Sequence, residues 1–229
     1  MTYYTAVNED LDDLRPMTRE ETIEAYRQII EEEPQALADL YIDFYDFRQI
    51  EFLIFKNRLS SAVLIANSAE HGIGQLASKL ETREQDGSYI VPGWEAESGD
   101  VLSESLGVTN DARNISIGAT IVTAVAALEA LLIDLAPKSE PRPKGLYQLL
   151  QAFLRRYAVL AAKTEIMKTE IMEMGKKVRD RRNTFAHSLT GSYWETDPSI
   201  AAMFTPETME DTLYTVGRIA VLMEEIVLA

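Results

Sequence analysis

The stretch VRDRRNTFAHSL, residues 178–189, holds the side chains of this chain that are best suited to chemistry. It contains Arg182, Asn183 and His187, and His187 is one of only two histidines in the chain. An imidazole titrates near neutral pH and can take or give a proton. A guanidinium can bind a phosphate through two hydrogen bonds and stabilise the charge that grows on it. Cleavage of RNA by its own 2′-hydroxyl needs these functions and no metal ion.

The spacing of these residues limits how they can cooperate. On an ideal helix Arg182 and His187 lie about 140° apart, so both serve one point only if the helix ends or distorts near His187. Asn183 and His187 are four residues apart and share a face. We therefore predict Arg182 and His187 as catalytic residues with Asn183 in support. The alternative is that His187 is a hydrogen-bonded core or capping histidine.

Other catalytic chemistries have little basis in this sequence. There is no cysteine, which excludes a thiol nucleophile and a thiolate metal site. A single histidine beside arginines is no set of metal ligands, and no G-x-S-x-G motif is present. His71, which precedes a glycine, is best explained as a residue at a helix C-terminus. We expect neither a metal ion nor a cofactor.

The charge of the chain is divided unevenly. The net charge is −15, yet residues 138–187 hold twelve basic and five acidic side chains, which is +7, so the remainder carries −22. Such an asymmetry indicates a local anion-binding surface on an acidic body. We expect that surface to bind RNA through four residues next to the motif, namely Lys176, Lys177, Arg179 and Arg181. The alternative is a solvated basic helix face.

Composition favours an ordinary globular protein. The 229 residues, 46% of them hydrophobic, suffice for one large domain or two small ones. The first residues, MTYYTAVNEDLDDL, are acidic and lack the apolar segment of a secretory signal. The runs IVTAVAALEALLIDLA and SAVLIANSA are interrupted or too short to span a bilayer. We therefore expect a cytoplasmic protein without a membrane segment.

The first half of the chain predicts helices followed by a loop. Thr18 and Glu21 form a capping box that opens a helix through about residue 33, and Pro34 allows a second helix to begin. Apolar residues then recur every three or four positions from Leu37 to Phe55, and the pattern continues to a break or kink at 71–74. Residues 85–111 are rich in Gly, Ser and acids and predict a long loop, in which SYIV could form one short strand.

The second half predicts four more helical segments. Residues 112–135 are apolar nearly all round and indicate a central core helix, in which the carboxylate of Glu129 requires a partner such as a motif arginine. A second segment covers 145–173, and Gly175 ends or bends it before the motif helix. The loop GSYWETDPS follows, and a last helix starts at Thr205-Pro206 and runs to about 227. No strand pattern competes, so the fold class is all-α, a helical bundle.

On these residues the chain resembles the HEPN superfamily, named for its presence in higher eukaryotes and prokaryotes. RDRRNTFAHS is similar to that family's Arg-polar-x3-to-5-His motif, and AALEALLIDL, which contains Glu129, is similar to its first core helix. The resemblance implies a HEPN-like bundle over 112–229. Residues 1–84 would form an additional N-terminal helical region and 85–111 the loop between them, or all would be one continuous all-α domain.

The resemblance also implies a function. Many HEPN proteins are metal-independent endoribonucleases, often in toxin–antitoxin or phage-defence systems, and they act as symmetric homodimers. RNA and a second copy of the chain are thus the expected partners, with an antitoxin or regulatory protein besides. One departure concerns toxins that carry a modifiable tyrosine two residues after the histidine, because this chain has Leu189 there and its closest downstream tyrosine is Tyr193. The alternative function is a non-catalytic helical module that binds RNA or protein and keeps the motif for packing.

Overall fold

The computed structural model describes residues 47–138, 143–157, 162–190 and 204–228. Over these residues the chain forms five helices and no strand, which confirms the all-α prediction. The helices are α3 (Ile50–Asp86), α4 (Glu95–Asp134), α5 (Leu146–Tyr157), α6 (Ala162–Thr190) and α8 (Pro206–Leu228). The predicted helices before residue 47, the loop GSYWETDPS and Tyr193 lie outside the described residues.

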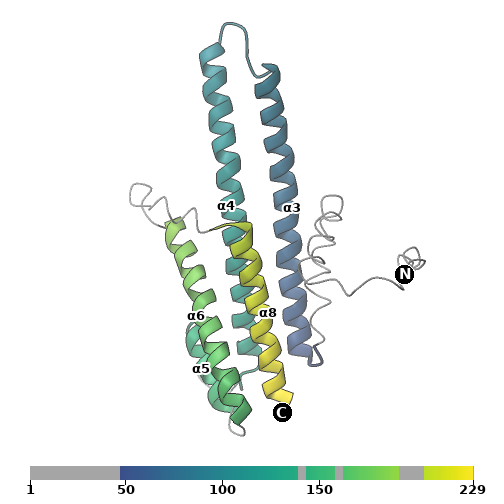
Figure 1. The fold of residues 1–229 in the computed structure, drawn as a ribbon, viewed down its shortest axis with the longest axis vertical. Helices are drawn as coiled ribbons and strands as arrows, with labels where there is room; N and C mark the ends of the chain where they lie inside the picture. Colours follow the sequence, from purple (N-terminus) through teal and green to yellow (C-terminus); the bar gives the residue numbers. More distant parts are fainter. Residues whose placement is uncertain (1–46, 139–142, 158–161, 191–203, 229) are drawn as a thin grey trace, which may run out of the picture.

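Helices α3 and α4 form a long antiparallel hairpin (Figure 1). They contain 37 and 40 residues, which at 1.5 Å per residue gives each a length of about 55–60 Å. Gly87 ends α3 in the left-handed conformation with φ 70°, which a glycine adopts without the penalty of a Cβ. The short connection 87–94 then leads directly into α4.

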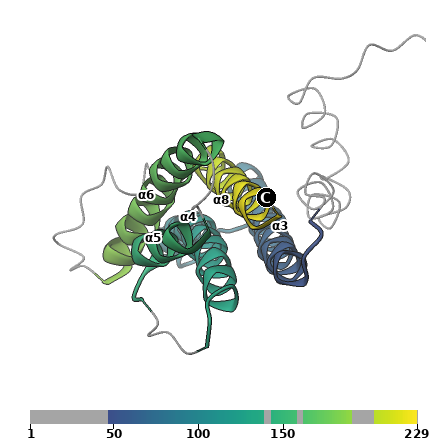
Figure 2. The same cartoon turned by 90° about the horizontal axis from the view of Figure 1, so that it is seen from below.

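The hairpin extends well beyond the other three described helices. Figure 1 shows α5, α6 and α8 against its lower half only, and Figure 2, which looks along the hairpin, shows α5 and α6 on the side of α4 and α8 beside α3. We call residues 67–113 the arm and the rest of the described chain the base. In the arm only Leu80, Leu102 and Thr109 are buried.

The core of the base surrounds the lower half of α4. Helix α4 packs against all four other described helices, which is why its sequence there is apolar on nearly every side. Leu128 and Leu131 of α4 are fully buried, as are Phe52 and Phe55 of α3 and Met223 of α8. The central core helix predicted over 112–135 is therefore present, as part of a longer helix.

One buried carboxylate in the base fixes the start of α3. The backbone N–H groups of Arg48 and Gln49 donate to Oε1 of Glu224 on α8, at 2.8 and 2.9 Å. Glu224 is only 6% exposed, so its charge is balanced by the amide dipoles of a helix N-terminus. This contact joins the end of the chain to the entry of the hairpin.

The predicted loop over 85–111 was wrong, because most of it is helix. Residues 95–111 belong to α4, and SYIV lies in the connection and forms no strand. Hydroxyl groups in this part satisfy carbonyls of the preceding turn, as Ser98 does for Trp94 and Ser105 for Val101. Polar residues therefore remain compatible with a helix that has solvent on most sides.

The expected interruptions at glycines were also wrong. Helix α3 runs through 71–74 and α6 through Gly175, since one glycine costs a helix only about 1 kcal/mol relative to alanine. Gly175 has a packing role instead, because a Cβ there would lie 2.3 Å from Cδ1 of Leu150 on α5. The segment predicted as one helix over 145–173 is described as α5 and the first part of α6.

Helix α4 bears on the expectation that the chain has no membrane segment. It is long and apolar enough to cross a membrane by length and composition, which the sequence runs alone did not suggest. However, 56% of its most apolar stretch is buried inside the bundle, so the neighbouring helices cover more than half of it.

Candidate functional site

Helix α6 positions the motif through residues spaced seven apart. Ile171, Val178 and Phe185 are buried and form the face that α6 turns to the base. Phe185 reaches α4 at Gly118, where a Cβ would lie 1.9 Å from the ring, so this close approach requires a glycine. Phe185 also packs edge-on against Phe204, with ring centroids 5.1 Å apart. These contacts hold the motif helix against α4.

Arg182 lies beside this buried face and is paired with Glu129. Its Nη1 donates to Oε1 of Glu129 on α4 at 2.8 Å, and the two side chains are only 24% and 21% exposed. Its Nε donates to Oδ1 of Asn183 at 3.3 Å. The structure thus brings together three of the predicted site residues, and the carboxylate of Glu129 has an arginine partner of the kind expected for it.

His187 is not brought to Arg182 within one chain. Helix α6 continues without a break to Thr190, so the two residues keep the separation of about 140° that an ideal helix gives. The side chain of His187 is exposed. The alternative of a core histidine is therefore excluded, and Arg182 and His187 do not converge on one point within a single copy.

Two of the predicted RNA-binding cations are bound to α8. Lys177 Nζ lies 2.6 Å from Oδ2 of Asp211, and Arg181 pairs with the same oxygen while donating to Thr212 Oγ1 at 3.0 Å. Partial burial would raise the pKa of Asp211, but the hydrogen bonds and charges of Lys177 and Arg181 outweigh it and leave the pKa below its ordinary value. Asp211, which no sequence pattern distinguished from its acidic neighbours, therefore joins α6 to α8.

The other two predicted RNA-binding cations differ from one another. Arg179 pairs with Asp180 at 2.6 Å, and its guanidinium lies 5.5 Å from the centre of the Tyr147 ring on α5. Lys176 is exposed and has no acidic partner among the described residues. Most of the local positive charge is thus engaged by the chain's own acids and by one aromatic ring.

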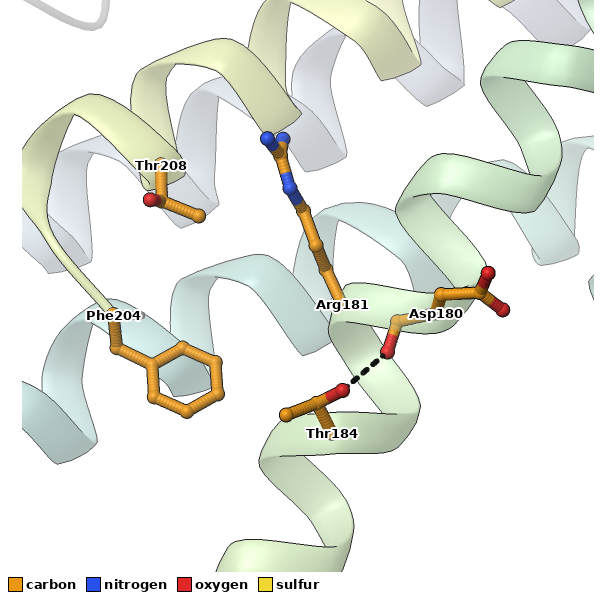
Figure 3. Close-up of a pocket in the computed structure, with 5 residues that line it drawn as sticks. All are labelled: Asp180, Arg181, Thr184, Phe204 and Thr208. Carbon is orange, nitrogen blue, oxygen red and sulfur yellow. Dashed lines mark hydrogen bonds between the residues drawn. The ribbon is translucent and has the colours of Figure 1, made fainter. Parts of the chain in front are cut away.

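A pocket of about 330 Å³ opens between α6 and the start of α8, one residue away from the motif arginine (Figure 3). Its lining residues are Asp180, Arg181, Thr184, Phe204 and Thr208. In Figure 3 the Arg181 side chain extends toward α8 while the Asp180 carboxylate points away, and Thr184 donates to the carbonyl of Asp180 at 2.9 Å. The pocket is a concave surface beside the site that the linear motif did not predict.

Comparison with known proteins does not assign the chain to a family. No protein-family model, no curated protein and no solved structure matches the chain. The HEPN resemblance therefore stays a prediction that rests on the motif residues and on the α4 segment around Glu129.

Proposed function

We propose that the protein is a metal-independent endoribonuclease of the HEPN type, with Arg182 and His187 as its catalytic residues. The observation that carries this proposal is the state of Arg182, which Glu129 and Asn183 hold through Nη1 and Nε. Within the described residues no hydrogen bond involves its Nη2, and the proposal assigns this group to the substrate phosphate. His187 is exposed on the same helix and can meet a substrate.

The chemistry follows from the groups present. A base removes the proton of the RNA 2′-hydroxyl, whose oxygen attacks the adjacent phosphorus, and an acid protonates the departing 5′-oxygen. The products are a 2′,3′-cyclic phosphate and a free 5′-hydroxyl. Arg182 stabilises the charge that grows on the phosphoryl oxygens, and its pairing with Glu129 keeps the guanidinium in place before substrate arrives.

This mechanism requires a second copy of the chain. One helix directs Arg182 and His187 about 140° apart, and the reaction uses both a base and an acid. A two-fold axis beside the C-terminal half of α6 would place two histidines and two arginines around one phosphate. The working unit of the proposal is therefore a symmetric homodimer whose site is incomplete in a single chain.

Binding of RNA in this proposal competes with internal ion pairs. Lys177, Arg179 and Arg181 each contact a carboxylate of the same chain, and a phosphate must share or replace those contacts. Lys176 is exposed and contributes its charge directly. An antitoxin or regulatory partner and a cytoplasmic location belong to the same proposal.

One observation favours a second candidate, a non-catalytic helical module that binds RNA or protein. The pairs of Arg182 with Glu129 and of Arg181 with Asp211 join α6 to α4 and to α8. In this alternative the motif arginines serve packing, and His187 is an exposed residue without a chemical role.

A nuclease assay separates the two candidates. The purified protein is incubated with single-stranded RNA in EDTA, and the ends of the products are analysed for cyclic phosphate. We expect cleavage by the unchanged chain, a loss of about 100-fold or more in the rate of His187→Ala, and a large loss in Arg182→Lys. The matched control is His71→Ala, which removes the other histidine, an exposed residue of the arm bonded to Gln75.

Undiminished cleavage by both motif variants would remove the enzyme proposal.

The need for two copies is tested by mixing wild-type chain with the inactive His187→Ala chain at a fixed total concentration. A site built from two chains loses activity as the square of the wild-type fraction. A linear decline would show that each chain acts alone and would overturn the two-copy site.

A further inference from the structure

A row of exposed apolar side chains at seven-residue spacing starts at Trp94, just before α4, follows one face of α4 through the arm and reaches Ile115, just inside the base. These are Trp94 (62% exposed), Val101 (61%), Val108 (61%) and Ile115 (49%). The residues four positions after each of them are small, namely Ser98, Ser105, Ala112 and Ala119. A row of this kind is the pattern of a helix that packs against another helix over three heptads, a length of about 32 Å.

In the base, α6 covers the same face of α4. Val122, the next member of the row, packs against the cluster that contains Phe185 of α6. Gly118, on the same side of α4, allows the Phe185 ring to approach. Helix α6 ends at Thr190, and above that level no described helix lies on this face (Figure 1). The arm thus continues a helix-binding face beyond the helix that occupies it in the base.

The charge of the arm determines which kind of helix can bind to the exposed apolar row. Glu97, Glu104 and Asp111 are exposed and form an acidic row at seven-residue spacing beside the apolar one. The arm as a whole, residues 67–113, has nine acidic and three basic side chains, a net charge of −6. A helix with basic residues beside its apolar stripe could pack that stripe against the apolar row and pair its basic residues with the acidic row.

Two other occupants are disfavoured by the same charge. Residues 1–46 of this chain hold thirteen acidic and three basic side chains, so they would bring a net charge of −10 to an acidic surface. A second copy of the arm, packed row against row, would oppose the three acids with their own equivalents. Both arrangements place like charges side by side, which is destabilising.

We propose that the arm is a docking site for an amphipathic helix of another protein, with an apolar stripe of seven-residue period flanked by lysine or arginine. The docked helix lies on α4 in line with α6, its apolar residues between Trp94 and Ile115 and its cations opposite Glu97, Glu104 and Asp111. This inference does not rest on the ribonuclease proposal, because no residue of the arm belongs to the proposed catalytic site.

The test uses the full chain and three labelled peptides of three heptads each. The first has leucine in the stripe and lysine in the flanks, the second has glutamate in the flanks, and the third keeps lysine but replaces the stripe by serine. Fluorescence anisotropy measures binding. We expect the first peptide to bind at least ten-fold more tightly than either of the others, and its binding to weaken as salt is raised.

Variants of the chain locate the binding. Val101→Asp and Val108→Asp, both at exposed positions, should weaken binding of the first peptide at least ten-fold without changing the helix content. The matched control Ser103→Asp adds the same charge on the far side of α4 and should leave the ratio between peptides unchanged. Equal binding of the three peptides, or no effect of Val108→Asp, would overturn the proposal.

Two further outcomes assign the face to other occupants. Sedimentation that shows a dimer converted to monomer by Val108→Asp would assign the row to a second copy and overturn the proposal. Binding to neutral phosphatidylcholine vesicles that Val108→Asp abolishes, with no binding of the first peptide, would assign it to a membrane surface and overturn it equally.

Discussion

One face of α4 meets different surroundings in the base and in the arm. In the base Val122 and its neighbours pack against α6, and residues such as Leu128 are fully buried among four helices. In the arm Val101 and Val108 lie on the same face and are mostly exposed, because α3 is the only described helix beside α4 there. The exposure differs because α6 packs on this face of α4 in the base and ends at Thr190, before the arm. Burial, and with it most of the stability, therefore belongs to the base, and the arm presents unsatisfied packing surface.

The largest contrast we expect is between leucines of the two regions. Leu128→Ala in the base should lower the free energy of unfolding by about 2–5 kcal/mol, since it removes a fully buried side chain. Leu76→Ala in the arm, at a position 50% exposed, should change it by about 0.5 kcal/mol or less. Urea denaturation of both variants measures the difference. Similar losses at the two positions would mean that the arm is packed against something in solution.

Two glycines of the same helix sharpen the contrast. Gly118→Ala should destabilise by about 1–3 kcal/mol, because the new Cβ would overlap the buried ring of Phe185. Gly107→Ala has open space around it and should stabilise by up to about 1 kcal/mol through higher helix propensity. Thermal melts of the two variants should therefore shift in opposite directions. A stabilised Gly118→Ala would contradict the close approach of α6 and α4.

Sequence periodicity predicted the fold class, the apolar core helix and the last helix. Thr205-Pro206 marked the start of α8 correctly, because proline is favoured in the first turn of a helix. The loop over 85–111 was mispredicted because glycine, serine and acidic residues are read as loop formers. The same residues are tolerated in a two-helix arm, where few positions must be apolar. Composition alone does not separate these two cases.

The candidate site was predictable in its residues but only partly in its contacts. Glu129 stood out as a carboxylate in an apolar helix, and its pairing with Arg182 follows from the cost of leaving it unpaired. Asp211 gave no such signal, because it lies among other acids in a helix remote from the motif. That it binds Lys177 and Arg181 depends on how α8 packs, which no local pattern specifies.

A smaller contrast is expected between two ion pairs of arginine and glutamate. Glu129→Gln in the base should cost about 1–2 kcal/mol, because it leaves the mostly buried Arg182 without a countercharge. Glu70→Gln in the arm breaks an ion pair with Arg113. Because the Glu70 side chain is 54% exposed, the free energy of unfolding should fall by at most about 0.5 kcal/mol. Denaturation curves at low salt compare them. Equal costs would show that Glu129 is solvated and does not fix Arg182.

The smallest contrast lies between two aspartates and appears as a dependence on pH. The pKa of Asp211 in the folded base is lower than its ordinary value of 3.8, since Lys177 and Arg181 outweigh the effect of its partial burial. A lowered folded pKa means that the unfolded chain binds the proton more readily. The stabilisation is therefore fully present above about pH 4 and is lost as the pH falls through the folded pKa. In the arm the pKa of Asp86 is also lowered, by its hydrogen bonds with Ser88, but this contact is local and fully exposed.

Asp211→Asn should therefore destabilise the protein at pH 7, and its difference from wild type should shrink as the pH falls through the folded pKa of Asp211. Because the Asp211 side chain is 43% exposed, solvent screening limits the loss at pH 7 to about 1 kcal/mol or less. Asp86→Asn should show no measurable difference from wild type at any of these pH values, since no second helix depends on it. Urea denaturation at pH 7, 5 and 3 gives both curves. A loss in Asp211→Asn that grows toward low pH would have the wrong sign for a stabilised carboxylate, and would show that the bridge from α6 to α8 does not hold in solution.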